Sequence, residues 1–276
     1  MSFRNQRNFR NNREKRRIDE EDKNEEQSNN PVIQQFKEYS KELDNKHDRH
    51  ERLVKISRDI TIEAKRIIFL LHNIDARKNN KERVLTEAKE RIDKLIANNF
   101  ALIAKELKNH EIFQFMRAVS PGIQEFIEAL TFYEFLAEKE DPSTWEEVQE
   151  KMKYKDGDDG NEYSLFLCPI EFILGYADLT GEVMRYCINS LGSAEIDNCF
   201  KTCKFLQHVY AKFLTISSVP NHGRDFSHKL STMKMSTLKS EHVCYQLKIR
   251  GTEGAKFPSL NLDFSINNDD VDEGFY

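Results

Sequence analysis

Four acidic residues form two pairs whose spacing suits a metal-dependent hydrolase. Glu125 and Glu128 are three residues apart, and Asp178 and Glu182 are four apart. Residues at these spacings share one face of a helix, so two packed helices can bring four carboxylates together. Such a cluster repels itself unless a cation neutralises it, and Mg²⁺ prefers oxygen ligands of this kind. Because bound Mg²⁺ activates water and stabilises a leaving oxygen, the pairs predict metal-dependent phosphodiester hydrolysis.

The same pairs also fit a solvated helix surface. The chain has 47 acidic residues in 276, and roughly eight acidic pairs arise by chance at any fixed spacing in such a composition. Gly175 and Gly181 lie inside an otherwise strong helical pattern and flank the face that carries Asp178 and Glu182. Glycines at such positions serve either close approach of a ligand to the backbone or tight packing of another helix. Spacing alone leaves both interpretations open.

A basic helix face is the candidate track for a nucleic-acid strand. Its residues lie on the side of a long helical segment away from the apolar stripe, and Asp59 and Glu63 dilute their charge. Spaced cations of this kind contact successive phosphates, although a solvated surface with internal ion pairs has the same pattern. The candidate RNA-binding residues are Arg52, Lys55, Arg58, Lys65 and Arg66.

The cysteines are expected to be core residues rather than zinc ligands. Cys199 and Cys203 are four residues apart with His208 nearby, but a second ligand pair at the usual spacing is missing from the sequence. Cys168, Cys187 and Cys244 likewise suit small buried positions. The sequence also has neither a phosphate-cradling glycine loop nor a dinucleotide-binding fingerprint.

Composition favours a soluble all-α protein. Charged residues make up 32% of the chain, against only ten glycines and six prolines, which is typical of long amphipathic helices. The net charge of -5 excludes a polycation, so nucleic-acid binding requires a local patch or a partner. Five cysteines without a disulfide framework, and the lack of an apolar signal segment or membrane-spanning run, predict a reducing intracellular compartment.

Three regions follow from charge and hydropathy. Residues 1–30 form a basic and then acidic leader with almost no large apolar side chains, and its REKRR cluster fits either a nuclear import signal or a solvated tail. Residues 31–250 are expected to form one helical domain, and residues 251–276 a polar acidic tail.

Seven helices are expected in the domain, arranged as a bundle of long antiparallel helices. No strand is expected. The first, 31–74, carries an apolar stripe from Leu53 to Ile74, and the second repeats the pattern through Leu85, Ala88, Ile92, Leu95 and Leu102. The proline and glycine at 121–122 predict a break between two shorter helices, and 155–164 is expected to be a loop. The short helix ending near 119 and the helix 121–138 are counted together as the third helix. The other expected helices are 31–74, 81–107, one from 145, 169–191, 195–216 and 224–250.

Three stretches resemble the translin and Trax family. They are HDRHERLVKISRDITIEAKRIIFLLHNI at 47–74, the pair GIQEFIEALTF at 122–132 with GYADLTGEVMRYCINSLG at 175–192, and CYQLKIRG at 244–251. The resemblance extends over nearly all of 31–251. It is closer to the Trax (translin-associated factor X) branch than to translin, because both acidic pairs are present and the translin branch is not the one credited with catalysis.

The resemblance implies a fold, an activity and partners. The family has a seven-helix fold, forms hetero-oligomers with translin that are expected here to be octameric, and cleaves single-stranded RNA with Mg²⁺. It activates the RNA-silencing complex by removing passenger strands. Single-stranded DNA binding, Mn²⁺ as a substitute for Mg²⁺, and a cytoplasmic and nuclear location are further expectations. Position by position, the family's acidic site falls on Glu125, Glu128, Asp178 and Glu182.

The resulting hypothesis is that the chain is a catalytic endoribonuclease subunit in which these four residues hold magnesium. No histidine or lysine is placed by the sequence as a general acid, so a second metal-bound water is the candidate for that role. The alternative is a noncatalytic helical partner that completes the translin oligomer, localises it or modulates its nucleic-acid binding.

Overall fold

The computed structural model describes residues 30–139, 142–155, 162–190, 196–217 and 223–250. The predicted leader up to residue 29 and the tail from residue 251 lie outside the described residues. Residues 1–55 and 56–276 form two compact units. The candidate acidic site lies wholly in the second unit.

Helix α2, Pro31–His72, begins where the sequence places it, because proline is tolerated in the first turn of a helix. In its second-unit part, Ile60, Ala64, Ile67 and Leu71 are fully buried, as the three-to-four spacing predicts. The following turn contains the short helix η1, Ala76–Lys78. On either side of the turn, Arg91 bonds Glu63 at 3.5 Å, which confirms an antiparallel hairpin.

The second expected helix contains a π-helical segment. It consists of α3, Lys81–Lys94, then η2, Leu95–Phe100, and then α4, Ala101–Glu106. A π turn holds an extra residue and shifts the phase of the buried face. The prediction was therefore wrong at Leu102, which is 51% exposed, and after Leu95 the buried positions are Phe100, Ile103 and Ala104. Leu85 is only half-buried, because Val84 takes the core position.

The break expected at Pro121 is absent from the described structure. The short helix η3, Ile112–Phe115, precedes α5, Met116–Leu136, which runs through the proline. Proline has no N–H group and disturbs the local bonding of a helix. Ser57 of α2 supplies replacement contacts here, since its Oγ accepts a hydrogen bond from Gly122 N at 3.0 Å and donates one to Val119 O at 3.4 Å.

A small hairpin corrects the expectation that there are no strands. Helix α6, Trp145–Lys151, begins with a capping box formed by Thr144 and Glu147. Strands β1, Lys153–Lys155, and β2, Glu162–Ser164, then pair antiparallel, with Tyr154 opposite Tyr163. Three-residue strands are too short to produce a periodic pattern, so the prediction of a plain loop over 155–164 missed them.

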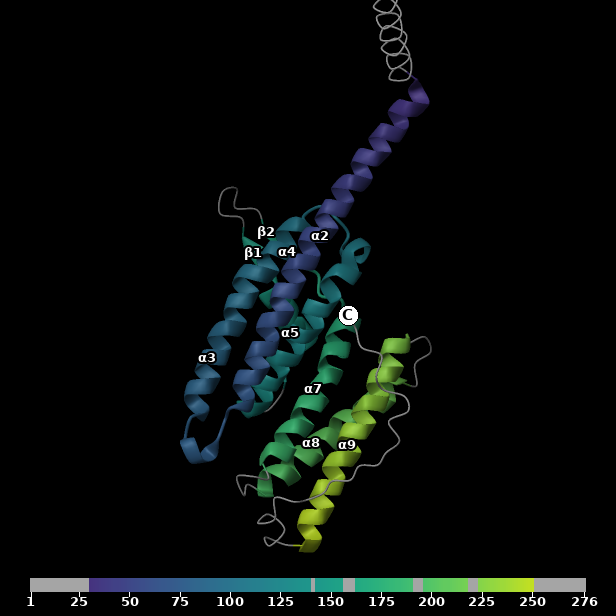
Figure 1. Ribbon diagram of the computed structural model, residues 1–276. Helices are drawn as coiled ribbons and strands as arrows, with labels where there is room; N and C mark the ends of the chain where they lie inside the picture. The colour runs from purple at the N-terminus through teal and green to yellow at the C-terminus, as the bar shows by residue number, and fades with distance from the viewer. Residues whose placement is uncertain (1–29, 140–141, 156–161, 191–195, 218–222, 251–276) are drawn as a thin grey trace, which may run out of the picture. The chain divides into compact units, whose positions relative to one another are not determined.

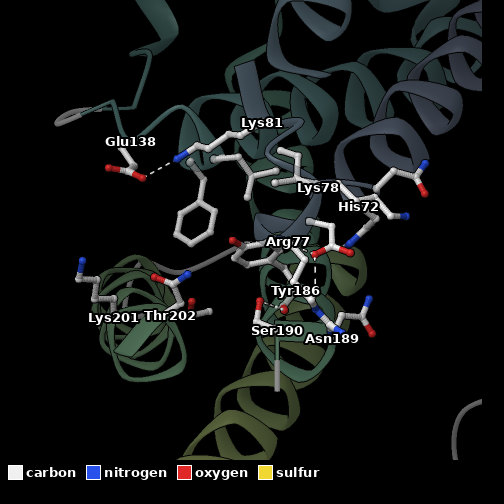
Figure 2. A pocket seen from close by; sticks show the side chains of 16 residues that line it. His72, Arg77, Lys78, Lys81, Glu138, Tyr186, Asn189, Ser190, Lys201 and Thr202 are labelled. Atoms are coloured by element: carbon white, nitrogen blue, oxygen red, sulfur yellow. Dashed lines mark hydrogen bonds and ion pairs between the residues drawn. The ribbon is translucent and has the colours of Figure 1, made fainter. Parts of the chain in front are cut away.

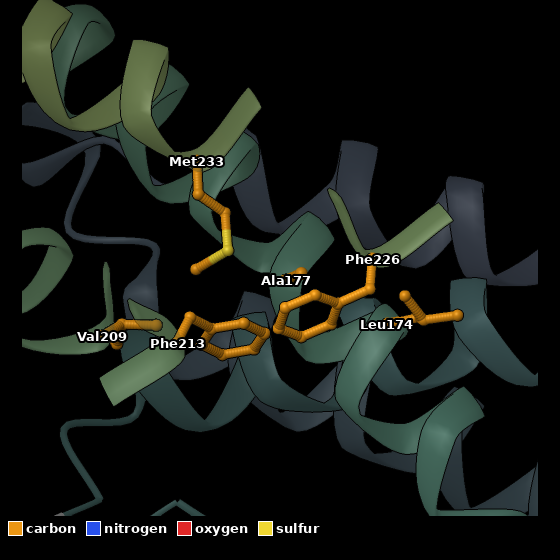
Figure 3. Packing of buried hydrophobic residues seen from close by; sticks show 6 residues of the cluster. All are labelled: Leu174, Ala177, Val209, Phe213, Phe226 and Met233. Carbon is orange, nitrogen blue, oxygen red and sulfur yellow. The ribbon is translucent and has the colours of Figure 1, made fainter. Parts of the chain in front are cut away.

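The last three helices pack around one apolar cluster. They are α7, Pro169–Ser190; α8, Ile196–Ser217; and α9, Arg224–Arg250 (Figure 1). Figure 3 shows the residues that α7, α8 and α9 contribute to the cluster: Leu174, Ala177, Val209, Phe213, Phe226 and Met233. Helix α7 also packs against α5. This contact positions the acidic site.

The expectation of an all-α bundle is confirmed. Counting α3, η2 and α4 as one continuous helix, the described residues contain the seven expected helices and one two-stranded hairpin. In this part of the chain, none of the helices combines the length and apolar character that crossing a membrane requires.

Candidate active site

Helices α5 and α7 bring the two acidic pairs to one place. Gly175 makes this possible: a Cβ atom on it would lie 2.6 Å from Gln124 O and 2.8 Å from Ile127 Cβ, so any larger residue would push the helices apart. Of the two functions left open for the glycines, tight helix packing is therefore the function of Gly175. Gly181 has nothing within 4 Å of its Cβ position, so packing does not require a glycine there.

Glu128 is the least compensated charge of the site. Within the described ranges its carboxylate forms neither a hydrogen bond nor an ion pair. Burial, followed by the negative charges of Asp178, Glu125 and Glu182, raises its pKa from 4.5 to about 9. All three other acids influence Glu128, so the four residues form one electrostatic cluster, as the spacing predicts.

Two lysines neutralise part of the cluster. Lys65 of α2 forms an ion pair with Glu125 at 3.2 Å. Lys229 of α9 forms an ion pair with Asp178 and donates to Gln124 Oε1 at 2.7 Å and to Leu174 O at 3.2 Å. Burial still raises the pKa of both carboxyls, more than the lysines lower it. The ammonium group of Lys229 thus lies among three oxygens, in surroundings that suit a cation.

Glu182 is held by a histidine and an arginine. His72 Nε2 lies 2.5 Å from Glu182 Oε2, and Arg185 donates to the same carboxylate at 2.9 Å. The imidazole packs against Phe132 with ring centroids 4.9 Å apart. Its other nitrogen, Nδ1, is buried and has no hydrogen-bond partner among the described residues.

Sequence reasoning missed His72 and Lys229. His72 is 110 residues from Glu182 in the chain, and Lys229 is 51 from Asp178. Spacing within one helix gives no sign of contacts between helices. His72 does lie at the end of the apolar stripe of α2, where a polar residue close to a core is a weak signal.

The four carboxylates fit a cation in number and chemistry, but their present geometry is that of ion pairs. In the described part of the chain, no group of three or more histidine, cysteine, aspartate or glutamate side chains is arranged to hold a metal ion. Lys65, Lys229 and His72 each draw one carboxylate toward its own helix. Ligation by several of them at once would require rotations of these side chains.

The basic face of α2 is exposed, as expected. Lys65 of this face pairs with Glu125, and Arg66 pairs with Glu63. Arg52 and Lys55 belong to the first unit and the others to the second. RNA contact by this face stays a prediction, and Lys65 links the face directly to the acidic site.

The cysteines are buried, as predicted. Cys187, Cys199, Cys203 and Cys244 share one core cluster of α7, α8 and α9, and Cys168 is buried elsewhere. Burial and hydrogen bonding raise the pKa of Cys187, and burial raises that of Cys244 to about 12. His208 is exposed and separate from this cluster.

Comparison with known proteins agrees with the fold and the motifs. The chain is 39% identical to mouse translin-associated protein X over 88% of this chain and 87% of the mouse protein. The fold is similar to the crystal structure of apo-NeC3PO, with a TM-score of 0.58 and 19% identity over 78% of this chain and 97% of that one. It is also similar to AfC3PO in a complex with duplex RNA, with a TM-score of 0.55 and 19% identity over 79% and 98%. The model of the Translin family matches residues 48–251, and the chain therefore belongs to the translin family.

Proposed function

We propose that this chain is the catalytic subunit of a translin-containing endoribonuclease and hydrolyses single-stranded RNA in a magnesium-dependent reaction. The observation that carries the proposal is Glu128, a largely buried carboxyl that forms no ion pair with any residue in the described ranges. Its burial, and then the charges of three further acids, raise its pKa to about 9. A buried negative cluster with an uncompensated member favours binding of a cation. The positions of all four acids match the acidic site that the family resemblance implies.

The donor set fits Mg²⁺, with Mn²⁺ as a substitute, because all four candidate ligands offer oxygen. Glu125, Glu128, Asp178 and Glu182 are the residues that would hold it. When bound, the cation supplies Lewis acidity toward a phosphate oxygen and lowers the pKa of a water molecule. His72 and Arg185 both bond the Glu182 carboxylate, which limits its rotation.

The two lysines give the site its means of accepting an anionic substrate. Lys65 and Lys229 bind carboxylates in the present structure. Both ammonium groups would be available to bind phosphate oxygens of the strand if the carboxylates held a cation instead. Lys229 is partly buried, with 18% of its side chain exposed, so its charge acts at short range and with little screening. A lysine so placed can also donate a proton to a leaving oxygen, the role for which the sequence offered only a water.

The biological role we propose is activation of the RNA-silencing complex by removal of passenger strands, in both cytoplasm and nucleus. The support is family membership together with a structural neighbour, AfC3PO, that was crystallised with duplex RNA. Single-stranded DNA is a second candidate ligand, since a basic face binds the phosphate backbone that DNA and RNA share.

A translin-family partner is supported by an apolar stripe on the first-unit part of α2. Its members recur at spacings of three and four residues and are more than half exposed: Val32, Phe36, Tyr39 and Leu43. Such a stripe is typical of a helix that packs against another helix in an assembly.

Replacing part of the stripe by polar residues should weaken assembly. The double variant Phe36→Gln, Leu43→Gln removes two large apolar side chains, and burial of each contributes about 1.5–3 kcal/mol at an interface. We expect the Kd for the translin partner to rise at least tenfold, measured by analytical ultracentrifugation. The control, Glu38→Gln with Lys41→Gln, changes the other side of the same helix and should assemble normally. Equal assembly of both double variants would exclude the stripe as an interface.

Magnesium should stabilise the protein through Glu128. At ten times its Kd, a ligand stabilises the folded state by about 1.4 kcal/mol, which corresponds to a Tm increase of about 3–5 °C in a chain of this size. We expect this increase in the wild-type assembly, and in the control Glu90→Gln on the exposed face of α3, but not in Glu128→Gln. Cleavage of a labelled single-stranded RNA should stop when a chelator is added.

The same experiment distinguishes the catalytic subunit from the alternative, a noncatalytic partner that stabilises or localises the oligomer. In that case the acids are only surface charge. Magnesium would then shift the Tm of Glu128→Gln as much as that of the wild type, and assemblies containing either protein would cleave RNA equally.

A further inference from the structure

A polar cavity of about 810 Å³ opens beside the acidic cluster, on the far side of His72. All of its walls belong to the second unit: the end of α2 and the turn after it, the ends of α5 and α7, and the beginning of α8. Figure 2 shows Arg77 and Tyr186 between His72 on one side and Lys201 with Thr202 on the other. The volume is within the range of about 300–1,000 Å³ that is usual for small-ligand sites.

The cavity carries excess positive charge. Of its four basic side chains, Lys81 pairs with Glu138 at 2.5 Å and Arg77 lies 3.8 Å from Asp75. Lys78 and Lys201 line the same cavity from the η1 turn and from α8, and the ammonium group of neither forms a hydrogen bond or close ion pair within the described ranges. The charge of Lys201 also acts on Glu138, but the four lysine and arginine side chains still outnumber the two acids, Asp75 and Glu138. This excess of cations favours an anionic ligand, and a phosphate group in particular.

The remaining walls suit a nucleoside. Tyr186 and Phe135 lie edge to face with ring centroids 6.3 Å apart, and both line the cavity and are partly exposed to it. Aromatic faces of this kind stack on nucleobases regardless of sequence. Amide side chains of Asn73 and Asn189 on the rim offer both donors and acceptors. Cations, aromatic rings and amides in one cavity are the groups that recognise a nucleotide.

His72 joins this cavity to the acidic cluster. The imidazole lines the cavity and also lies 2.5 Å from the Glu182 carboxylate. A nucleotide bound beside His72 would therefore be separated from the Glu182 carboxylate by a single side chain. We infer that the cavity binds one nucleotide of a single-stranded nucleic acid next to the bond that is cleaved, with Lys78 and Lys201 holding its phosphate. This assignment rests on the proposed nuclease function.

Binding, measured without cleavage, tests the assignment. The full-length chain in its assembly is titrated with a fluorescent single-stranded RNA in the presence of a chelator, and anisotropy is recorded at several salt concentrations. For Lys78→Ala with Lys201→Ala we expect the Kd to rise about tenfold. The slope of log K against log salt should become shallower by about 0.7, the value for one phosphate contact on a single strand. Both lysines are exposed, so the variant should fold normally.

A matched pair of lysines provides the control. Lys105 and Lys234 are exposed, lie on α4 and α9 and do not line this cavity. Their double alanine variant removes the same charge and should bind RNA as the wild type does. Equal weakening by both double variants would overturn the assignment, because it would reflect net charge alone.

Photo-crosslinking locates the strand directly. RNA containing 4-thiouridine should crosslink to Tyr186 or Phe135 in the wild type and much less in the lysine variant. Adenosine 5′-monophosphate is the second probe, and its binding as tightly as the oligonucleotide would overturn the assignment to a strand.

If Glu128→Gln still cleaves RNA, the proposed function fails even where the crosslink is found. If it does not cleave, and the lysine variant binds and crosslinks normally, only the cavity assignment fails.

Discussion

Glu128→Gln is expected to lower cleavage of single-stranded RNA by roughly a thousandfold while making the metal-free protein more stable. The loss follows because the amide keeps the shape of the side chain but removes the charge that a cation requires, and loss of one preorganised electrostatic contact in an active site costs about 10²–10³ in rate. The gain in stability follows because burial and the charges of Asp178, Glu125 and Glu182 force Glu128 to take up a proton when the chain folds, which a glutamine does not need to do.

The stability effect has a defined pH dependence. The pKa of Glu128 is raised from 4.5 to about 9 in the folded protein. Below pH 4.5 the carboxyl is protonated in both the folded and unfolded states, so wild type and variant are alike. Between these two pKa values only the folded state keeps the proton, so the wild type loses stability as the pH rises and the variant does not. The advantage of Glu128→Gln should therefore be small at pH 5 and clear at pH 8.

Thermal unfolding of the assembly in chelator at these two pH values measures the difference, with about 2–4 °C in Tm for each kcal/mol. Glu90→Gln, on the exposed face of α3, should show neither effect. A Glu128→Gln protein that is less stable than the wild type at pH 8 would contradict the raised pKa of Glu128 in the folded protein. A Glu128→Gln protein that cleaves RNA at the wild-type rate would show that catalysis takes place at another site.

Gly175→Ala should destabilise the protein and impair the active site together. The new Cβ would lie 2.6 Å from Gln124 O and 2.8 Å from Ile127 Cβ, and the first of these is backbone that cannot move aside alone. Overpacking of this kind costs up to about 3 kcal/mol. We expect the Tm to fall by roughly 6–12 °C. Because the separation of α5 from α7 sets the distance between the two acidic pairs, cleavage should also fall by up to about a hundredfold.

Gly181→Ala is the matched control on the same helix. Nothing lies within 4 Å of its Cβ position, and alanine is the better helix former, so the variant should be more stable by about 0.5–1 kcal/mol. Opposite signs for the two glycine variants would establish that contact between helices, rather than glycine content, governs this part of α7. A Gly175→Ala protein as stable as the wild type would contradict the close approach of the helices.

The sequence predicts most helices because their apolar stripes have one period. It places the beginnings of α2 and α7 at prolines. Spacing shows that the two acidic pairs could converge, and the family resemblance selects them. It fails where one element depends on another. Pro121 stays inside α5 because Ser57, from a distant part of the chain, bonds the neighbouring backbone. The register after Leu95 changes with a π turn that has no marker in composition.

The candidate site divides in the same way. The acids repeat within single helices and can be found from the sequence, with the family resemblance to distinguish them from the many other acidic pairs. Their cationic partners, Lys65, Lys229 and His72, come from α2 and α9 and depend on how the helices pack. The cavity beside His72 is assembled from the ends of several elements, so only the folded chain reveals it.

The burial of the cysteines has a practical consequence. All five are free and buried, and the pKa of Cys187, Cys203 and Cys244 is raised, so little reactive thiolate is present near neutral pH. Maleimide dyes should therefore leave the native protein almost unlabelled. A single cysteine introduced at an exposed position such as Lys105 would be the main reactive thiol, so the assembly could carry one fluorophore without any native cysteine being replaced.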